Sequence, residues 1–343
     1  NKTAYGYKFG GCTIKECFDL LVSEEKFNIK KQRSEVIEFN KNNKFKKMGI
    51  AIVPVIYPVG FSARFMNQGF AEVEIFKDGT VKVFHGGCEM GQGLNTKMAQ
   101  IAATVLSIPI EKVEVRSNRT DHVPNASPTS GSTGTDINGG AVENACEILR
   151  DRLKKYREVE GRTWEEAIKI AYFDQIDLSA KGNFTQKDVN FDWDKHLKNI
   201  EEAKNGADLE SVKACKCFSY GCSASKVEID LLTGDHQILR TDVVADVGSS
   251  LNQAIDIGQI EGGLLQGIGY FTIEEPIVGR KPHNSDITQK DDSFDLNEWL
   301  PPGKMYTNGP SFYKVPSISD VPQSLNIDLL EREVQPAGIL GSK

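Results

Sequence analysis

The sequence predicts an α+β fold in which packed helices cover mixed sheets. Two hairpins support this prediction most directly. The first spans residues 70–87 (FAEVEIFKDGTVKVFHGG), where two alternating runs flank an Asp78–Gly79 turn that favours positive φ values. The second spans residues 218–248 and turns at residues 233–235. Apolar residues recur at helical spacing around both hairpins, and this mixture of hairpins and helices is typical of the α+β class.

The N-terminal part predicts two helices and a strand. Residues 13–24 favour a helix with a capping box formed by Thr13 and Glu16. Its apolar face would comprise Ile14, Cys17, Phe18 and Leu21. A strongly charged helix is expected at about 27–45, followed by an apolar strand at 48–57.

The middle of the chain predicts a further set of amphipathic helices. One starts at Leu94, before a strand at 111–117 and a polar loop at 122–136. Its apolar face comprises Leu94, Met98, Ile101, Ala102 and Val105. The next helix can be capped by Thr135 or Asp136, and its apolar face comprises Ile137, Ala141, Ala145, Leu149 and Leu153. A capping box of Thr163 and Glu166 predicts one more short helix.

The C-terminal half alternates between weak and strong patterns. Residues 175–215 are polar without periodicity, which favours a surface elaboration. A glycine-bearing helix at 256–271 follows the second hairpin, and a final strand is expected near 325–331. The residues of that helix expected to face a core are Ile257, Ile260, Leu264, Ile268 and Phe271.

Bulk properties exclude several functional classes. A formal net charge of -7 over 343 residues argues against nucleic acid or an anionic membrane as a partner. The longest apolar run, at 48–61, is short and contains Pro54 and Pro58, so no bilayer span is expected. Seven scattered cysteines favour reduced, cytoplasmic thiols over disulfides or a zinc site. The chain opens without methionine or a signal pattern and stops straight after a strand-like run, so we expect a piece of a longer polypeptide.

Three glycine-rich stretches precede or enter helices. The first, GGCEMGQG (86–93), lacks both the Gly-Lys-Ser/Thr of a phosphate loop and the third glycine of a dinucleotide fingerprint. Backbone N–H groups and the Gln92 amide would stand at the positive end of a helix, a geometry that suits an anionic or oxo-bearing ligand. The alternative is a tight strand-to-helix turn packed on protein.

The other two stretches allow a similar pair of interpretations. In SPTSGSTGTDING (127–139), small residues can form a nest of N–H groups for a phosphate, or a flexible surface loop. In the helix at 256–271, Gly258, Gly262, Gly263 and Gly267 each cost about 1 kcal/mol relative to alanine. They imply close approach of another helix or of a ligand, and Gln259 is the polar residue of interest there.

Other catalytic patterns are missing from the sequence. No HExxH pair supports a zinc hydrolase, and no Gly-x-Ser-x-Gly elbow supports an α/β-hydrolase. His85 is expected to be a strand-end residue and not a general base.

Four stretches together resemble one known family. They are HGGCEMGQGLNTKMAQ (85–100), VPNASPTSGSTGTDINGGAV (123–142), the second hairpin with its helix (218–269) and GPSFYKVPS (309–317). In this order they resemble the molybdenum-cofactor domain of the xanthine dehydrogenases and aldehyde oxidases, and the match runs from about residue 5 to 343. The stretch GSSLNQAIDIGQ (248–259) resembles the xanthine dehydrogenase branch more closely.

The resemblance implies a division of the chain. Residues 1–60 would lead into the molybdenum domain, and 61–174 would form a first molybdopterin-binding subdomain. Residues 175–215 would be the surface elaboration. Residues 216–343 would form a second such subdomain, truncated before the segment that carries the catalytic glutamate.

The resemblance also implies a cofactor and the residues that would hold it. Molybdopterin carries a phosphate, and in this family it binds molybdenum. The cofactor-binding residues would be Gly91, Gln92, Gly93, Ser130, Gly131, Ser132, Gly134 and Gln259. Gly131 and Gln92 would lie closest to the molybdenum without ligating it through their side chains. The substrate-binding residues would be Phe61, Ser62, Phe65 and Met66, since an aromatic face can stack on a planar ring and a hydroxyl can bond its edge.

The implied activity is the hydroxylation of purines, from hypoxanthine and xanthine to urate, with water-derived oxygen. No catalytic base lies in this chain, because the family's glutamate is expected just beyond Lys343. Iron–sulfur clusters and FAD would belong to domains outside it, and the family implies a homodimer. An aldehyde substrate, a truncated non-catalytic paralogue acting as an assembly partner, and a metal-free phosphate-binding module stay open. Ser130 and Gly131 stand where many members have alanine, and Asn308 where arginine is common, which leaves fine substrate preference undecided.

Overall fold

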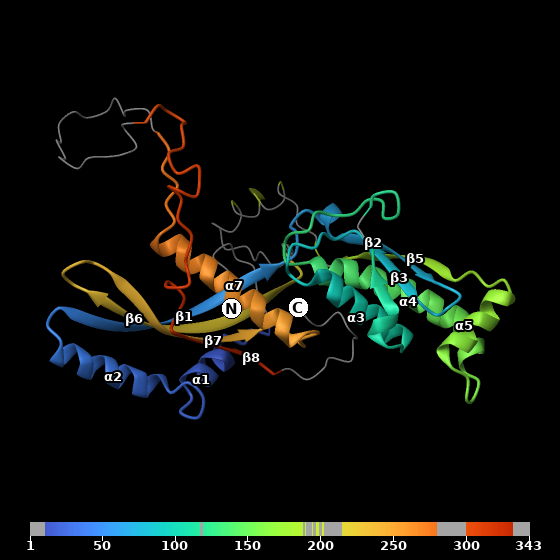
Figure 1. Ribbon diagram of the computed structural model, residues 1–343, viewed down its shortest axis with the longest axis horizontal. Coiled ribbons are helices and arrows are strands. Elements are labelled where there is room, and N and C mark those ends of the chain that lie inside the picture. The colour runs from blue at the N-terminus through green and yellow to red at the C-terminus, as the bar shows by residue number, and fades with distance from the viewer. Residues whose placement is uncertain are drawn as a thin grey trace.

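Two four-stranded sheets organise the molecule. The computed structural model describes residues 11–116, 119–187, 215–279 and 300–331, together with residues 189, 194, 197, 198 and 201. The two sheets follow one another along the long axis, and each is covered by its own helices (Figure 1). Apolar periodicity therefore produces two cores within this part of the chain.

The first sheet has the order β1-β6-β7-β8. Its strands are β1 (Lys46–Val59), β6 (Cys217–Asp230), β7 (His236–Asp246) and β8 (Ser324–Leu329). Neighbours are antiparallel except β7 and β8, which are parallel. Helices α1 (Ile14–Val22) and α2 (Ile29–Asn42) contact this sheet through β6 and β1. The buried residues between helices and sheet are Cys17, Leu21, Ile29, Cys222, Ala224 and Val244.

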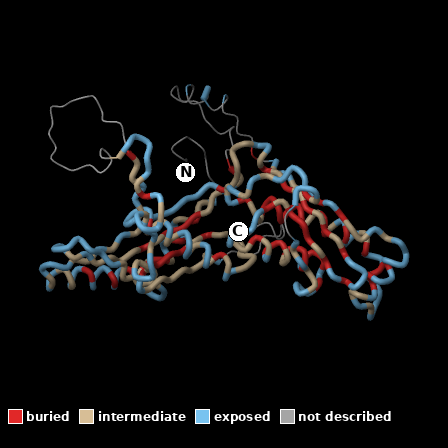
Figure 2. The backbone as a smooth tube through the Cα atoms, turned by 45° about the horizontal axis from the view of Figure 1, so that its top comes forward, coloured by how far each residue is buried: buried red, intermediate tan, exposed pale blue. Residues whose placement is uncertain are grey.

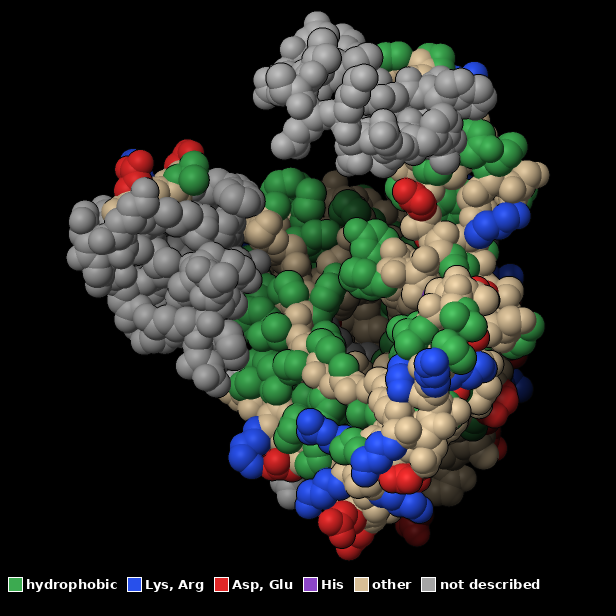
Figure 3. Space-filling view, turned by 90° about the vertical axis from the view of Figure 1, so that its left-hand side faces the viewer, with side chains coloured by type: hydrophobic (Ala, Val, Ile, Leu, Met, Phe, Trp, Pro, Cys, Tyr) green, Lys and Arg blue, Asp and Glu red, His purple; other side chains and the backbone are tan. Residues whose placement is uncertain are grey.

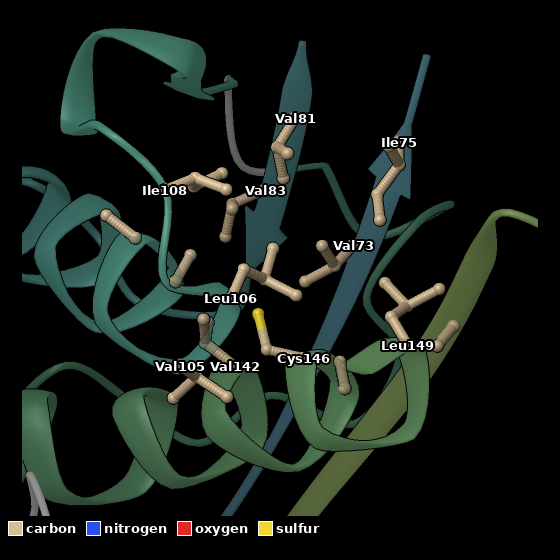
Figure 4. Packing of buried hydrophobic residues seen from close by; sticks show 14 of the residues in the cluster. Val73, Ile75, Val81, Val83, Val105, Leu106, Ile108, Val142, Cys146 and Leu149 are labelled. Carbon is tan, nitrogen blue, oxygen red and sulfur yellow. The ribbon is translucent and has the colours of Figure 1, made fainter. Parts of the chain in front are cut away.

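The second sheet has the order β4-β3-β2-β5. Its strands are β2 (Gln68–Ile75), β3 (Val81–His85), β4 (Val113–Val115) and β5 (Ser179–Thr185). Helices α3 (Leu94–Leu106), α4 (Gly134–Arg157) and α5 (Trp164–Phe173) complete this half. Valine and isoleucine side chains of β2 and β3 pack against valine and leucine side chains of α3 and α4 (Figure 4). Buried residues run through the interior of this half (Figure 2).

Helix α7 (Gln253–Thr272) links the two halves. It begins beside α3, where Ile255 lies against Gly93, and runs back over the first sheet to contact β8 (Figure 1). Asn252 caps its first turn by accepting the N–H of Ile255. The start of α7 therefore lies next to the glycine-rich entrance of α3.

Strand β1 is an edge of the described first sheet and carries exposed apolar side chains. Val53, Val55 and Tyr57 are each about half exposed, at 54%, 49% and 53%. Pro54 and Pro58 also lie in this strand, as an edge position permits. Hydrophobic side chains gather around a hollow on the face at this end of the molecule (Figure 3).

The strongest sequence patterns are confirmed. Both hairpins form, with positive φ at Gly79 and Gly234 in their turns. The predicted apolar faces of α3 and α4 are buried throughout. The capping box of Thr163 and Glu166 is present at the start of α5. His85 ends β3 and is fully buried, as expected of a strand-end residue.

Three predictions about helix ends and faces were wrong. Thr13 makes no capping bond, because its hydroxyl donates to Asp246 Oδ2 of β7 at 2.6 Å, and Phe18 of the predicted apolar face is 41% exposed. Helix α4 begins at Gly134, so Thr135 and Asp136 lie within it and do not cap it. At α1 the capping bond is lost because a residue distant in the chain takes the Thr13 hydroxyl.

Two further expectations fail for reasons of residue size and packing. Residues 179–185, inside the region expected to be unpatterned, form β5 beside β2. Their buried positions are Ala180 and Gly182, which are too small to give a hydropathy signal. In α7, Phe271 is 84% exposed and the other four apolar residues are only partly buried, so the helix does not face a core among the described residues.

Candidate cofactor site

The first glycine-rich loop is closed by a glutamate. Gly91 and Gly93 adopt φ values of +93° and +76°, and Gly93 is the N-cap of α3. The carboxylate of Glu89 accepts the N–H groups of Gly91 (2.9 Å), Gly93 (3.0 Å) and Asn95 (2.9 Å). Partial burial tends to raise the pKa of Glu89, but these N–H donors outweigh it and the pKa is lowered. The expectation that this loop exposes free N–H groups is therefore wrong for Gly91 and Gly93.

Gln92 is fixed by the same loop. Its Oε1 accepts the N–H of Met90 at 2.5 Å, and its Nε2 donates to the carbonyl of Cys88 at 2.9 Å. The side chain is half-buried, and no side chain stands within 4 Å of the open position at neighbouring Gly91. The loop thus presents backbone and amide groups in a fixed arrangement.

The second glycine-rich loop meets the segment before β2. Gly131 and Ser132 have φ values of +64° and +55°, and the carbonyl of Gly131 accepts the N–H of Gly60 at 2.9 Å. A Cβ on Gly131 would lie 3.5 Å from the Phe61 ring. The N–H groups of Gly134 and Thr135, at the start of α4, have no acceptor among the described residues.

Two hydrogen bonds bring the three glycine-rich stretches together. The N–H of Cys88 donates to Thr129 Oγ1 at 2.8 Å, joining the first loop to the second. Gln259 Nε2 of α7 donates to the carbonyl of Gly91 at 3.3 Å, joining the first loop to the third stretch. Stretches as far as 168 positions apart along the chain therefore line one region of the molecule.

The predicted substrate residues differ in how far they are exposed to solvent. Phe61 and Ser62 are half-buried, and the Phe61 ring lies beside Gly131. Phe65 is 70% exposed, and Met66 ends a short 3₁₀ turn (Arg64–Met66). Asn67, which is almost fully buried, fixes this loop. It accepts the N–H of Phe61 at 3.1 Å and donates to the carbonyls of Phe61 and Ala63.

A buried ion pair supports the junction of α3 and α7. Lys97 Nζ lies 2.6 Å from Asp256 Oδ1, and both side chains are only 6% exposed. Ser250 Oγ donates to the other carboxylate oxygen of Asp256 at 2.5 Å. The pair thereby joins the helix that follows Gln92 to the helix that carries Gln259.

His85 is neutral by its geometry. Its Nδ1 accepts the N–H of Gly87 at 3.1 Å, so the proton is on Nε2, which donates to Asn95 Oδ1 at 2.9 Å. Burial lowers the pKa of His85, which agrees with this tautomer. His85 therefore supports the base of the first glycine loop.

The described residues lack two features. None of their helices is long and apolar enough to cross a membrane. They also hold no group of three or more His, Cys, Asp or Glu side chains that could bind a metal ion.

Comparison with known proteins decides the family. The family model described as "Molybdopterin cofactor-binding domain" matches residues 23–322. The chain belongs to this family. The match covers all three glycine-rich stretches, so the resemblance seen in the sequence is confirmed.

Curated relatives of this molybdopterin domain are much longer proteins. Xanthine dehydrogenase/oxidase of Gallus gallus is 41% identical over 99% of this chain, which covers 22% of that protein. Xanthine dehydrogenase of Oryza sativa is 39% identical over 99% of the chain and 23% of its own length. Aldehyde oxidase 4 of Rattus norvegicus is 39% identical over the whole chain and 23% of its own length. The molybdopterin domain thus spans less than a quarter of each.

Solved structures share its fold. Quinoline 2-oxidoreductase from Pseudomonas putida superposes with a TM-score of 0.72 at 23% identity, covering 96% of this chain and 40% of that one. Aldehyde oxidoreductase from Desulfovibrio desulfuricans gives a TM-score of 0.67 at 22% identity, covering 96% and 31%. The α+β prediction, with mixed sheets and packed helices, is therefore confirmed.

The residues of the domain fit a phosphate-bearing pterin. The N–H groups at the start of α4 lack acceptors among the described residues, and a helix N-terminus favours an anion. Gly91 leaves open space where a side chain would stand. Sequence reasoning missed Glu89, Asn67 and Lys97, although the carboxylate of Glu89 before a helix start was a visible signal.

Proposed function

We propose that this domain binds molybdopterin with molybdenum and forms part of a cytoplasmic, xanthine dehydrogenase-like enzyme that hydroxylates purines. The observation that carries the proposal is the convergence of the three glycine-rich stretches through Cys88–Thr129 and Gly91–Gln259. A relative named xanthine dehydrogenase/oxidase is 41% identical across the chain, which supports the purine assignment.

The residues of this chain have positioning roles in the proposal. Bound molybdenum would supply the redox chemistry of hydroxylation. Gln92 and Gln259 would orient the pterin from α3 and α7, while the start of α4 with Ser130, Ser132 and Gly134 would hold its phosphate. Gly131 and Gln92 would lie nearest the metal.

The substrate would lie against the segment before β2. Phe61 offers an aromatic face and Ser62 a hydroxyl, in a loop that Asn67 keeps in one shape. Phe65 and Met66 would border the pocket. The general base, the iron–sulfur clusters and FAD would come from the rest of the full-length protein, which we propose is a homodimer.

The cofactor assignment predicts stoichiometric molybdenum and pterin in the purified full-length protein. Elemental analysis and pterin fluorescence after acid release, both set against protein concentration, measure this directly. Replacing Gly134 by Asp should lower both contents, because a carboxylate at the start of α4 would repel the phosphate. Molybdenum-free protein with bound phosphate alone would contradict the proposal, and protein with neither would favour the non-catalytic paralogue.

A second candidate activity is the oxidation of aldehydes. The rat aldehyde oxidase is nearly as similar to this chain as the xanthine dehydrogenases are. A panel of purines and aldehydes assayed with the full-length protein separates the two. We expect kcat/KM for hypoxanthine and xanthine to exceed that for every aldehyde, and the reverse order would identify an aldehyde oxidase.

A further inference from the structure

We propose that Glu89 is a positioning residue of this site, whose carboxylate sets the shape of the glycine loop that presents Gln92 and the Gly91 carbonyl. The inference rests on the proposed function, because it requires that loop to face the cofactor. Among the described residues, the Glu89 carboxylate accepts hydrogen bonds from its own loop and the first turn of α3, and from neither Gln259 nor the second loop. Its effect would pass entirely through the backbone of residues 90–95.

The carboxylate uses both oxygens. Oε1 accepts the N–H groups of Gly91 and Gly93, and Oε2 accepts the N–H of Asn95. Gly93 is the N-cap of α3 and Asn95 lies in its first turn, so a carboxylate of the chain itself lies at the positive end of that helix. An anionic part of a ligand is therefore directed to the start of α4, where Gly134 and Thr135 lack acceptors among the described residues.

The loop needs the Glu89 carboxylate because its two glycines do not fix the backbone conformation by themselves. Gly91 and Gly93 both have positive φ, and neither has a side chain that could fix the turn. With the turn fixed, the carbonyl of Gly91 points to Gln259 of α7 and accepts its amide at 3.3 Å. The Gln92 side chain then bonds the residues on either side of Glu89, namely Cys88 and Met90.

A purely structural capping role for Glu89 predicts a different result. Helix α3 is anchored by the fully buried side chains of Met98, Ile101 and Leu106. Loss of the Glu89 bonds should therefore loosen the loop and leave the helix and the neighbouring hairpin in place. If Glu89 served only stability, its loss should speed amide exchange across the second sheet and leave the cofactor content unchanged.

The test compares E89Q, E89D and E111Q in the full-length protein. Glutamine keeps the size but turns an NH₂ group toward at least one N–H donor, and aspartate keeps the charge on a shorter arm. Glu111, an exposed residue of the 3₁₀ turn Ile110–Lys112, provides the charge-matched control. The readouts are amide hydrogen exchange, molybdenum and pterin content, and the electron paramagnetic resonance spectrum of the reduced metal.

We expect E89Q to speed amide exchange at residues 90–95 by about tenfold and to leave residues 70–85 unchanged. Cofactor content should fall by about tenfold, or the metal spectrum of the loaded fraction should shift, as outer-sphere changes do. E89D should recover part of both effects, and E111Q should match the wild type.

Three outcomes would overturn the inference. E89Q with wild-type cofactor content and an unchanged spectrum would show that the loop does not need the carboxylate. Faster exchange across residues 70–85 as well would assign Glu89 a general structural role. A wild-type protein without molybdenum or pterin would contradict both the proposed function and this inference. A wild-type protein that contains the cofactor, with an E89Q variant whose cofactor content and metal spectrum are unchanged, would contradict this inference alone.

Discussion

Replacement of Lys97 by methionine is expected to lower the free energy of unfolding by about 3–5 kcal/mol, because it leaves the Asp256 carboxylate buried without its cation. Both partners are 6% exposed, so water cannot replace the lost contact, and among the described residues only Ser250 continues to donate to the Asp256 carboxylate. Urea denaturation followed by circular dichroism measures the change. The loss should also loosen the start of α7 and with it Gln259.

Two comparison variants make this result specific. K15M removes a cation from the exposed pair Lys15–Asp19 and should leave the stability unchanged. The double variant K97M/D256L replaces both charges by apolar groups and should be more stable than K97M alone. A K97M protein as stable as K15M would show that the pair contributes nothing to the junction of α3 and α7.

Substitution of Gly182 by alanine is expected to cost about 3 kcal/mol, at the upper end of overpacking effects. Its Cβ would stand 2.1 Å from the carbonyl oxygen of Ala141 and 2.6 Å from the amide nitrogen of Ala145, both in the backbone of α4. Because backbone cannot rotate out of the way as a side chain can, β5 must shift away from α4. Thermal unfolding of the variant measures the loss.

The matched control is alanine at Gly262 of α7. Nothing described lies within 4 Å of a Cβ at that position, and alanine is the better helix former. G262A should therefore equal or slightly exceed the wild type in stability. Equal losses for G182A and G262A would contradict the close approach of β5 and α4.

Local patterns predicted those parts of the fold in which a residue's neighbours in sequence decide its structure. The Asp78–Gly79 turn and the buried faces of α3 and α4 follow from residue spacing alone. Distant partners explain the failures. Thr13 resembles a cap, but Asp246, 233 positions away, takes its hydroxyl. Strand β5 gives no hydropathy signal because its buried residues are small, as the close approach of α4 demands.

The candidate site was predictable in its residue types and not in its bonding. Glycines before a helix identified the first loop, yet spacing could not show that Glu89 turns back to occupy the N–H groups of Gly91 and Gly93. Nor could it show that Gln259 bonds the Gly91 carbonyl, since such a contact depends on how α7 crosses α3. The roles given to the predicted cofactor-binding and substrate-binding residues all stay predictions.

The edge that β1 forms in the described first sheet has a bearing on how such a chain avoids pairing strand to strand with another copy. Residues 54, 56 and 58 direct their backbone groups to the same side of the strand, and two of the three are prolines, which have no N–H. Prolines in edge strands direct their nitrogen to solvent, so only Ile56 could donate to an incoming strand over this stretch. The side chains of Val53, Val55 and Tyr57 give this edge an apolar surface. The missing N–H donors of the two prolines oppose the addition of a strand from another copy.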